Sequence, residues 1–241
     1  MPENSTPRLA LSEAFIVKFI AVLASAGLIL SFVLLLVAMS MYPNFSLVDH
    51  TLSRLGRVSL GCGAEQYFGQ PYFNAAYIIG ALSLIPFYAI LARGSHVAGQ
   101  KKARNAFCFL IIAACGLIGA GIMTDDNATF RLHLTQSGTF FLAAGIACFF
   151  FILEWWIDNR GARKWAVAYL VFLLSNVAAW ILYDAYLDPV LGYNGGIPEF
   201  FTFVSFYLMN AVFIGNVFKN GPIIPMVRPP LNRLAERRKC A

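Results

Sequence analysis

The sequence predicts an all-α polytopic membrane protein, a bundle of six transmembrane helices with both termini in the cytoplasm. Three observations predict this fold class: six apolar stretches of membrane-spanning length, a composition that is 59% hydrophobic and 12% charged, and a mean hydropathy of +0.67. A helix of about 20 apolar residues crosses a hydrocarbon core about 30 Å thick. Backbone amides find no water in lipid, so each stretch must be a helix rather than an open sheet.

The six stretches and their connections form one domain. The predicted spans are Ala14–Met41, Pro71–Ala92, Asn105–Met123, His133–Ile157, Trp165–Tyr186 and Phe200–Phe218. We therefore expect a cytoplasmic segment at residues 1–13, a transmembrane domain at 14–218 and a basic cytoplasmic tail at 219–241. The first stretch is too long for the core of a signal peptide, and no small-residue cleavage pattern follows it closely. We interpret it as a retained helix.

Basic residues predict the orientation, because short loops rich in Lys and Arg stay in the cytoplasm. The tails, the start of the first span and the even-numbered connections hold Arg8, Lys18, Arg93, Lys101, Lys102, Arg104, Arg160, Arg163, Lys164, Lys219, Arg228, Arg233, Arg237, Arg238 and Lys239. The odd-numbered connections hold only Arg54, Arg57 and Arg131. The net charge of +6 therefore reports topology, and its spread over four segments gives no reason to expect nucleic acid as a partner. We expect a multi-pass protein of the cell membrane.

Small residues in the third and fourth spans predict where helices touch. They are Cys115, Gly116, Gly119, Ala120 and Gly121 in the third span, and Ala143, Ala144, Gly145 and Ala147 in the fourth. Small side chains let two backbones approach closely in lipid. In the first outer connection, the apolar residues of Ser46–Val58 suit a short helix or re-entrant turn, and a plain surface loop is the alternative.

Polar side chains gather at the outer ends of the spans and predict an outward-facing pocket. Polar residues inside a bundle are costly, so each is a functional hypothesis. The candidate ligand-binding residues are His50, Ser53, Asn74, Asp126, His133, Gln136, Tyr183 and Glu199. Each also has a structural interpretation. Asp125 and Asp126 can favour the positive end of a helix, Asn176 and Asn210 can hydrogen-bond between helices, and the remaining acids can be interfacial charges.

The same residues allow catalytic or metal chemistry without specifying it. His50, Asp126 and His133 are the catalytic candidates, and Ser53 or Ser137 could supply a nucleophile, but no nucleophile elbow is present. His50, His133 and Asp126 could also ligate zinc. The spacings HxxxH, HExxH and CxxC are absent, so we predict no metal site. The balance is against an enzyme, and the sequence identifies no cofactor.

Two stretches carry a family resemblance. The first is Tyr42-Pro43-Asn44-Phe45-Ser46 with His50-Thr51-Leu52-Ser53-Arg54-Leu55-Gly56 and Tyr72-Phe73-Asn74, and the second is Gly121-Ile122-Met123-Thr124-Asp125-Asp126 followed by His133. Together they resemble the prokaryotic membrane family catalogued as domain of unknown function 998, which is distantly similar to the Frag/DRAM/Sfk membrane proteins. This chain has Met123-Thr124 where members often carry Phe-Pro. The resemblance implies six helices and draws attention to His50, Ser53, Asn74, Asp126 and His133.

Three functions follow as hypotheses. The first is an outward-facing polar pocket that binds a lipid headgroup or similar small amphiphile, which the lipid and trafficking roles of the distant relatives favour. The second is a membrane-embedded lipid hydrolase or transferase that acts through His50, His133 and Asp126. The third is an accessory subunit of a larger membrane complex. The expected partners are membrane lipids, with other membrane subunits or self-association as alternatives.

Overall fold

The computed structural model describes residues 11–57, 68–123, 130–158, 163–183 and 196–220. Its elements are α1 (Leu11–Met41), the 3₁₀ helix η1 (Leu52–Gly56), α2 (Gln70–Val97), α3 (Lys101–Ile122), α4 (Phe130–Leu153), the π-helical turn η2 (Glu154–Asp158), α5 (Arg163–Leu182) and α7 (Gly196–Asn220). Within these residues, six helices are long and apolar enough to cross a membrane. The predicted six-helix, multi-pass architecture is confirmed.

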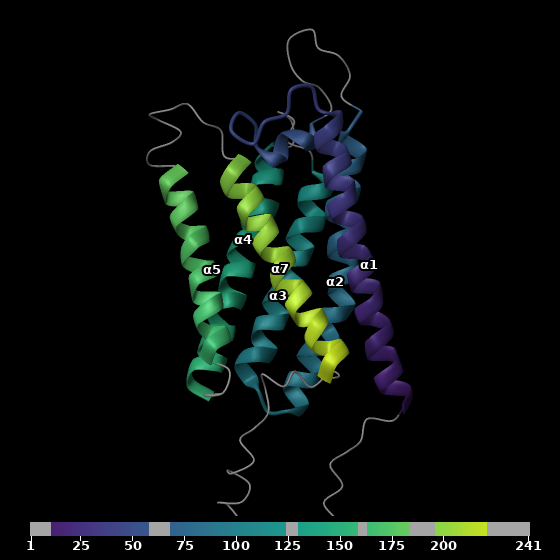
Figure 1. The fold of residues 1–241 in the computed structure, drawn as a ribbon, viewed down its shortest axis with the longest axis vertical. Helices are drawn as coiled ribbons and strands as arrows, with labels where there is room; N and C mark the ends of the chain where they lie inside the picture. The colour runs from purple at the N-terminus through teal and green to yellow at the C-terminus, as the bar shows by residue number, and fades with distance from the viewer. Residues whose placement is uncertain (1–10, 58–67, 124–129, 159–162, 184–195, 221–241) are drawn as a thin grey trace, which may run out of the picture.

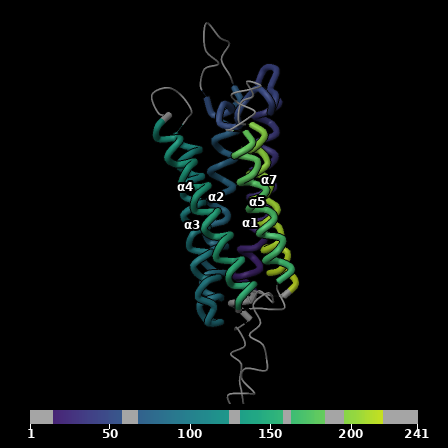
Figure 2. Tube along the Cα trace, turned by 90° about the vertical axis from the view of Figure 1, so that its left-hand side faces the viewer, coloured from purple at the N-terminus to yellow at the C-terminus, as the bar shows by residue number. Residues whose placement is uncertain are grey.

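The six long helices run side by side along the long axis of the molecule (Figure 1). α1 begins and α7 ends at the same end, the lower one in Figure 1, and η1 lies at the opposite end. Seen from the side, α2, α3 and α4 form one layer, and α1, α5 and α7 form a second layer beside it (Figure 2). α5 is at the edge of the bundle, and only 11% of its most apolar 18-residue stretch is buried inside the protein.

Small residues account for the close packing of α3 on α4. A Cβ added at Gly116 would lie 2.8 Å from the backbone nitrogen of Phe140, so only glycine allows this approach. At Gly119 the added carbon would meet the side chain of Gln136. The predicted contact between these spans is confirmed there, but Cys115 is exposed and Gly145 has nothing within 4 Å of an added Cβ. Those two positions were wrongly assigned to helix contacts.

The helices extend past the apolar stretches at several ends. α3 begins at Lys101, before the predicted start at Asn105, and α2 continues to Val97. Long basic side chains reach the headgroup layer while their backbone stays helical, so a charge does not end a helix.

At the start of α3, the buried carboxylate of Glu154 accepts a 3.2 Å hydrogen bond from the backbone N–H of Ala103. This contact satisfies one of the amides that a helix N-terminus leaves unpaired.

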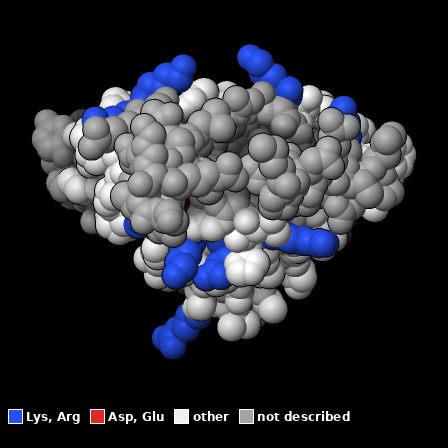
Figure 3. All heavy atoms as spheres, turned by 90° about the horizontal axis from the view of Figure 1, so that it is seen from below, with Lys and Arg blue, Asp and Glu red and all other residues white. Residues whose placement is uncertain are grey.

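Basic residues mark the end of the bundle where α1 begins and α7 ends (Figure 3). Those at this end within the described ranges are Lys18, Arg93, Lys101, Lys102, Arg104, Arg163, Lys164 and Lys219, against Arg54, Arg57 and Arg131 at the other. Charge is therefore segregated along the bundle axis, while the assignment of the basic end to the cytoplasm stays a prediction. Residues 1–10 and 221–241 lie outside the described ranges, so the two terminal segments also stay predictions.

Candidate functional site

The 3₁₀ helix η1 is fixed by apolar and polar contacts to the end of the bundle opposite the basic residues. Leu52 and Leu55 are 1% and 0% exposed and anchor it from below. The backbone N–H of Ser53 donates to Oε2 of Glu199 at 3.2 Å, and the Ser53 hydroxyl donates to Oε1 at 3.3 Å. Glu199 lies in the first turn of α7, where the positive end of the helix favours a carboxylate. Of the alternatives that the sequence left open for this connection, a short helix is the one observed.

The start of α7 also lies directly against the backbone of the connection between α1 and α2. A Cβ added at Gly196 would fall 2.0 Å from the carbonyl oxygen of His50 and 2.6 Å from that of Leu47. Backbone atoms cannot move aside as a flexible side chain can, so this position requires glycine. The contact holds the His50 segment over the mouth of the bundle.

Four polar residues from four elements line a small cavity below η1. They are Ser53 of η1, Tyr77 of α2, Ser137 of α4 and Glu199 of α7, and the apolar walls are Leu117, Ala120, Phe140, Phe141 and Phe203. Its volume is about 20 Å³, enough for one water molecule. We call it the polar cavity. Two of the predicted ligand-binding residues, Ser53 and Glu199, meet here.

His133 is buried beside this cavity with its ring nitrogens in defined roles. Its Nδ1 lies 2.7 Å from the carbonyl oxygen of Met123 and 3.2 Å from that of Ala120. Carbonyl oxygens only accept, so Nδ1 carries the proton and donates. In the neutral ring, Nε2 then accepts from the hydroxyl of Ser137 at 3.4 Å. The His133 ring therefore hydrogen-bonds to two carbonyl groups at the end of α3. It also orients the Ser137 hydroxyl in the polar cavity.

His50 lies in a different environment. Its Nδ1 accepts a 3.3 Å hydrogen bond from the backbone N–H of Ser46, and its ring packs against Tyr42 and Phe45 with centroids 5.1 Å and 5.8 Å away. Within the described part of the chain, His50 and His133 share no hydrogen-bond partner. Asp126 lies outside the described residues. The convergence of His50, Asp126 and His133 therefore stays a prediction.

The other three candidates do not line the polar cavity. Oδ1 of Asn74 is buried without a hydrogen-bond partner near η1. The Gln136 side chain covers Gly119, and the ring of Tyr183 contacts Trp180 with centroids 6.2 Å apart. Over the described ranges, no group of three or more His, Cys, Asp or Glu residues could hold a metal ion.

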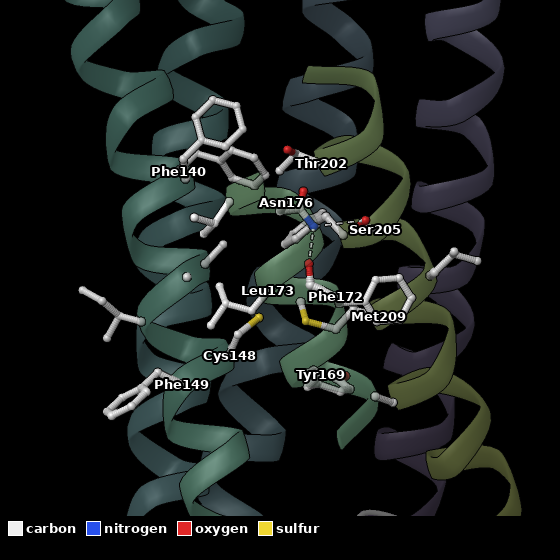
Figure 4. A pocket seen from close by; sticks show the side chains of 18 of the residues that line it. Phe140, Cys148, Phe149, Tyr169, Phe172, Leu173, Asn176, Thr202, Ser205 and Met209 are labelled. Carbon is white, nitrogen blue, oxygen red and sulfur yellow. Dashed lines mark hydrogen bonds between the residues drawn. The ribbon is translucent and has the colours of Figure 1, made fainter. Parts of the chain in front are cut away.

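A much larger cavity, which the sequence did not indicate, lies between α4, α5 and α7 (Figure 4). Its volume is about 970 Å³ and its lining is almost wholly apolar. We call it the apolar cleft. Leu142, Phe149 and Val177 line it and are 68%, 54% and 46% exposed, so the cleft opens onto the surface that faces lipid. Gly145, where an added Cβ would meet no atom within 4 Å, is also part of its wall.

The two cavities are neighbours. Phe140 and Phe141 line both of them and form the wall between them. The polar cavity includes Glu199 in the first turn of α7, and the apolar cleft is lined by residues further along α7, from Thr202 to Val212. The arrangement places a small hydrogen-bonding site next to a long apolar one.

A few polar groups lie inside the cleft and in the core. Nδ2 of Asn176 donates to the carbonyl oxygen of Phe172 at 2.9 Å and to Oγ of Ser205 at 3.4 Å. Trp180 donates to Thr202 at 3.2 Å. In the core, the hydroxyl of Tyr88 donates to Oδ1 of Asn210 at 2.6 Å. The interpretation of Asn176 and Asn210 as residues that hydrogen-bond between helices is confirmed.

A comparison with protein families agrees with the motif resemblance. The family described as Protein of unknown function (DUF998) matches residues 25–214. This range includes every residue that lines the two cavities. No curated protein and no solved structure matches the chain.

Proposed function

The chain belongs to the family of proteins of unknown function DUF998, and we propose that it binds a membrane lipid or a similar small amphiphile. The hydrocarbon part of the ligand lies in the apolar cleft, and its polar part lies toward the polar cavity at the outer end. In this proposal the protein resides in the cell membrane with the polar cavity facing outward. Membrane lipids are its partners, and self-association or other subunits act through other faces.

The observation that supports this proposal is the shared wall of Phe140 and Phe141. On one side of the wall the lining is apolar, and on the other side hydroxyls and a carboxylate converge. An amphiphile matches this arrangement, because it carries an apolar part directly next to a polar part.

The size and shape of the cleft favour a lipid over a partner helix. A volume of about 970 Å³ is at the upper end of the range of small-molecule sites, roughly 300–1,000 Å³. From Trp165 to Ile181 the lining follows α5 for about 24 Å, most of a hydrocarbon core of roughly 30 Å. Helix contacts in membranes use small residues, whereas large side chains such as Phe149, Phe172 and Leu173 dominate this wall.

Fluorescence quenching tests the proposal, because Trp180 lines the cleft. The protein is placed in vesicles of phosphatidylcholine with brominated acyl chains, and the contribution of Trp180 is the difference from a Trp180→Phe variant. We expect strong quenching of Trp180, and relief of that quenching by Gly145→Leu, which fills the cleft. Gly138→Leu is the matched control, because Gly138 is on the same helix, has open space around it and does not line the cleft. Equal quenching in all three proteins would contradict the proposal.

One observation favours a second candidate function, hydrolysis or transfer of an acyl group of such a lipid. The Ser137 hydroxyl lines the polar cavity and faces Nε2 of His133, whose tautomer is the one that a general base needs. A lipid ester carbonyl lies where hydrocarbon meets polar groups, which here is the Phe140–Phe141 wall. Of the residues that the sequence offered for such chemistry, this candidate uses Ser137 and His133, and it needs neither His50 nor Asp126.

A fluorophosphonate probe with a long alkyl chain tests this second candidate. Covalent labelling of the protein that is lost in Ser137→Ala and much reduced in His133→Phe would support it. Labelling that persists in Ser137→Ala, or no labelling of the native protein under conditions that label a serine esterase, would exclude it. Thr139→Ala, two residues further along α4 and not part of the cavity lining, is the control for non-specific loss.

A further inference from the structure

Two polar groups on the cleft side of α5 have no hydrogen-bond partner among the residues that the structure describes. Oδ1 of Asn176 and the hydroxyl of Tyr169 are both buried and unpaired, and both residues line the apolar cleft. They are seven residues apart, which places them on one face of the helix. Tyr169 is only 4% exposed. A buried polar group without a partner costs about 1–3 kcal/mol, and lipid offers no water to replace the missing bond.

The neighbours of Asn176 cannot satisfy its oxygen. Both N–H groups of its amide are engaged, with Phe172 and Ser205, and the carbonyl of Phe172 fixes which amide atom is the nitrogen. In Figure 4 the amide oxygen lies on the side of Thr202. The Thr202 hydroxyl already donates to the carbonyl of Pro198, and the indole N–H of Trp180 donates to Thr202. Neither proton is free for Asn176, so an acceptor remains inside an apolar site.

From these contacts we infer that Asn176 selects, among amphiphiles, those with a hydroxyl or amide N–H donor directly next to their hydrocarbon chains. This inference rests on the proposed function and names the class of ligand for the same cleft. Asn176 lies six residues before the end of α5 at Leu182, about 9 Å along the axis. That depth is below the charged headgroups and among the hydrocarbon chains, so the donor must be one that enters the cleft together with the chains. Flexible lining side chains such as Met209 make room for the donor.

A matched pair of probes tests the inference. One is a diacylglycerol with brominated acyl chains and a free hydroxyl, and the other is its acetate ester, which has the same chains and no donor. Each is titrated into vesicles of unbrominated phosphatidylcholine that contain the full-length protein, and quenching of Trp180 is measured. We expect the diacylglycerol to quench at a concentration about fivefold to tenfold lower than the acetate.

Three variants decide between specific and general effects. Asn176→Leu should remove the preference, so that both probes quench equally. Tyr169→Phe removes a hydroxyl from the same face but leaves Asn176, and the preference should persist. Ser205→Ala should also keep it, because Phe172 still orients the amide. If Asn176→Leu fails to fold, the effect of capping the hydroxyl on the native protein still tests the inference.

The outcomes separate this inference from the proposed function. If neither probe quenches Trp180 beyond the effect of an equal amount of brominated phosphatidylcholine, and Gly145→Leu changes nothing, the cleft binds no lipid and both ideas fail. If both probes quench equally in the native protein, lipid binding stands and the selection by Asn176 is overturned. A preference that survives Asn176→Leu also overturns it.

Discussion

Both carboxylate oxygens of Glu199 accept hydrogen bonds from Ser53, a residue 146 positions earlier in the chain. The pair joins the first turn of α7 to η1 above the polar cavity, at the end of the bundle opposite the basic residues. Hydrogen bonds to a charged group contribute about 1.5–3 kcal/mol. We expect Glu199→Ala to lower the free energy of unfolding by that amount, and Ser53→Ala, which removes only the hydroxyl bond, by about 1 kcal/mol.

Hydrogen exchange at the amide of Ser53 checks this prediction most directly. The amide should lose protection in Glu199→Ala and keep most of it in Ser53→Ala, because the backbone bond survives there. Glu13→Ala, at the other end of the bundle, is the control. Equal protection of the Ser53 amide in all four proteins would show that the pair does not hold η1.

A second prediction concerns Gly196, where the start of α7 lies against the backbone of His50 and Leu47. An alanine there would put its Cβ within 2.0 Å of the His50 carbonyl oxygen, so α7 and the first outer connection must separate. We expect Gly196→Ala to lower the thermal midpoint by several degrees. Gly138→Ala, which has open space, should leave the midpoint unchanged or raise it slightly, since alanine favours a helix. A thermal midpoint for Gly196→Ala at or above that of Gly138→Ala would contradict the packing described.

His133 should matter more for stability than His96. The buried His133 ring pairs carbonyls at the end of α3, and its loss leaves them unsatisfied at a cost of about 1–3 kcal/mol. His96 is exposed and contacts Arg104 at the basic end. We therefore expect His133→Ala to lower the thermal midpoint clearly and His96→Ala to lower it little, as followed by thermal denaturation in detergent micelles. Equal effects would mean that the bonds of His133 to α3 contribute nothing net.

The orientation gives a prediction that is independent of any ligand. In a variant without native cysteines, Pro43→Cys should react with a membrane-impermeant maleimide added to intact cells. Val97→Cys, at the exposed end of α2, should react only after the membrane is opened. The basis is the concentration of Lys and Arg at the end of the bundle that holds Val97. Labelling of Val97→Cys from outside would reverse the orientation and turn the polar cavity toward the cytoplasm.

Most of the fold could be predicted from the sequence because bilayer thickness fixes the length of an apolar helix. Glycine positions such as Gly116 and Gly119 also predicted where α3 and α4 meet. The ends of helices were less certain: the basic residues after Lys101 lower the hydropathy and so hide the start of α3, although snorkelling side chains let the helix begin there. The helix contact expected at Gly145 was wrong, since a small residue next to a cavity has the same sequence pattern as one in a tight contact.

The candidate site was predictable only in part. Ser53 and Glu199 were named because polar residues at the outer ends of spans are costly, and they do meet. The apolar cleft could not be found this way, because its lining is apolar like any lipid-facing surface. The apolar cleft exists because α5 lies at the edge of the bundle and leaves a space between itself, α4 and α7. Asn176 was the one available signal, and its structural interpretation was also correct, since one end of its amide holds α7 while the other is unpaired.

Photo-crosslinking in native membranes tests the central claim that a lipid chain occupies the apolar cleft. Cells are supplied with a fatty acid that carries a diazirine midway along its chain, which enters the membrane lipids, and the crosslinked residues are mapped by mass spectrometry after irradiation. The account predicts adducts on Leu173, Phe172 and Met209 inside the cleft, and their loss in Gly145→Leu but not in Gly138→Leu. Adducts confined to outward positions such as Leu132 and Leu134, with the same pattern in both variants, would contradict it.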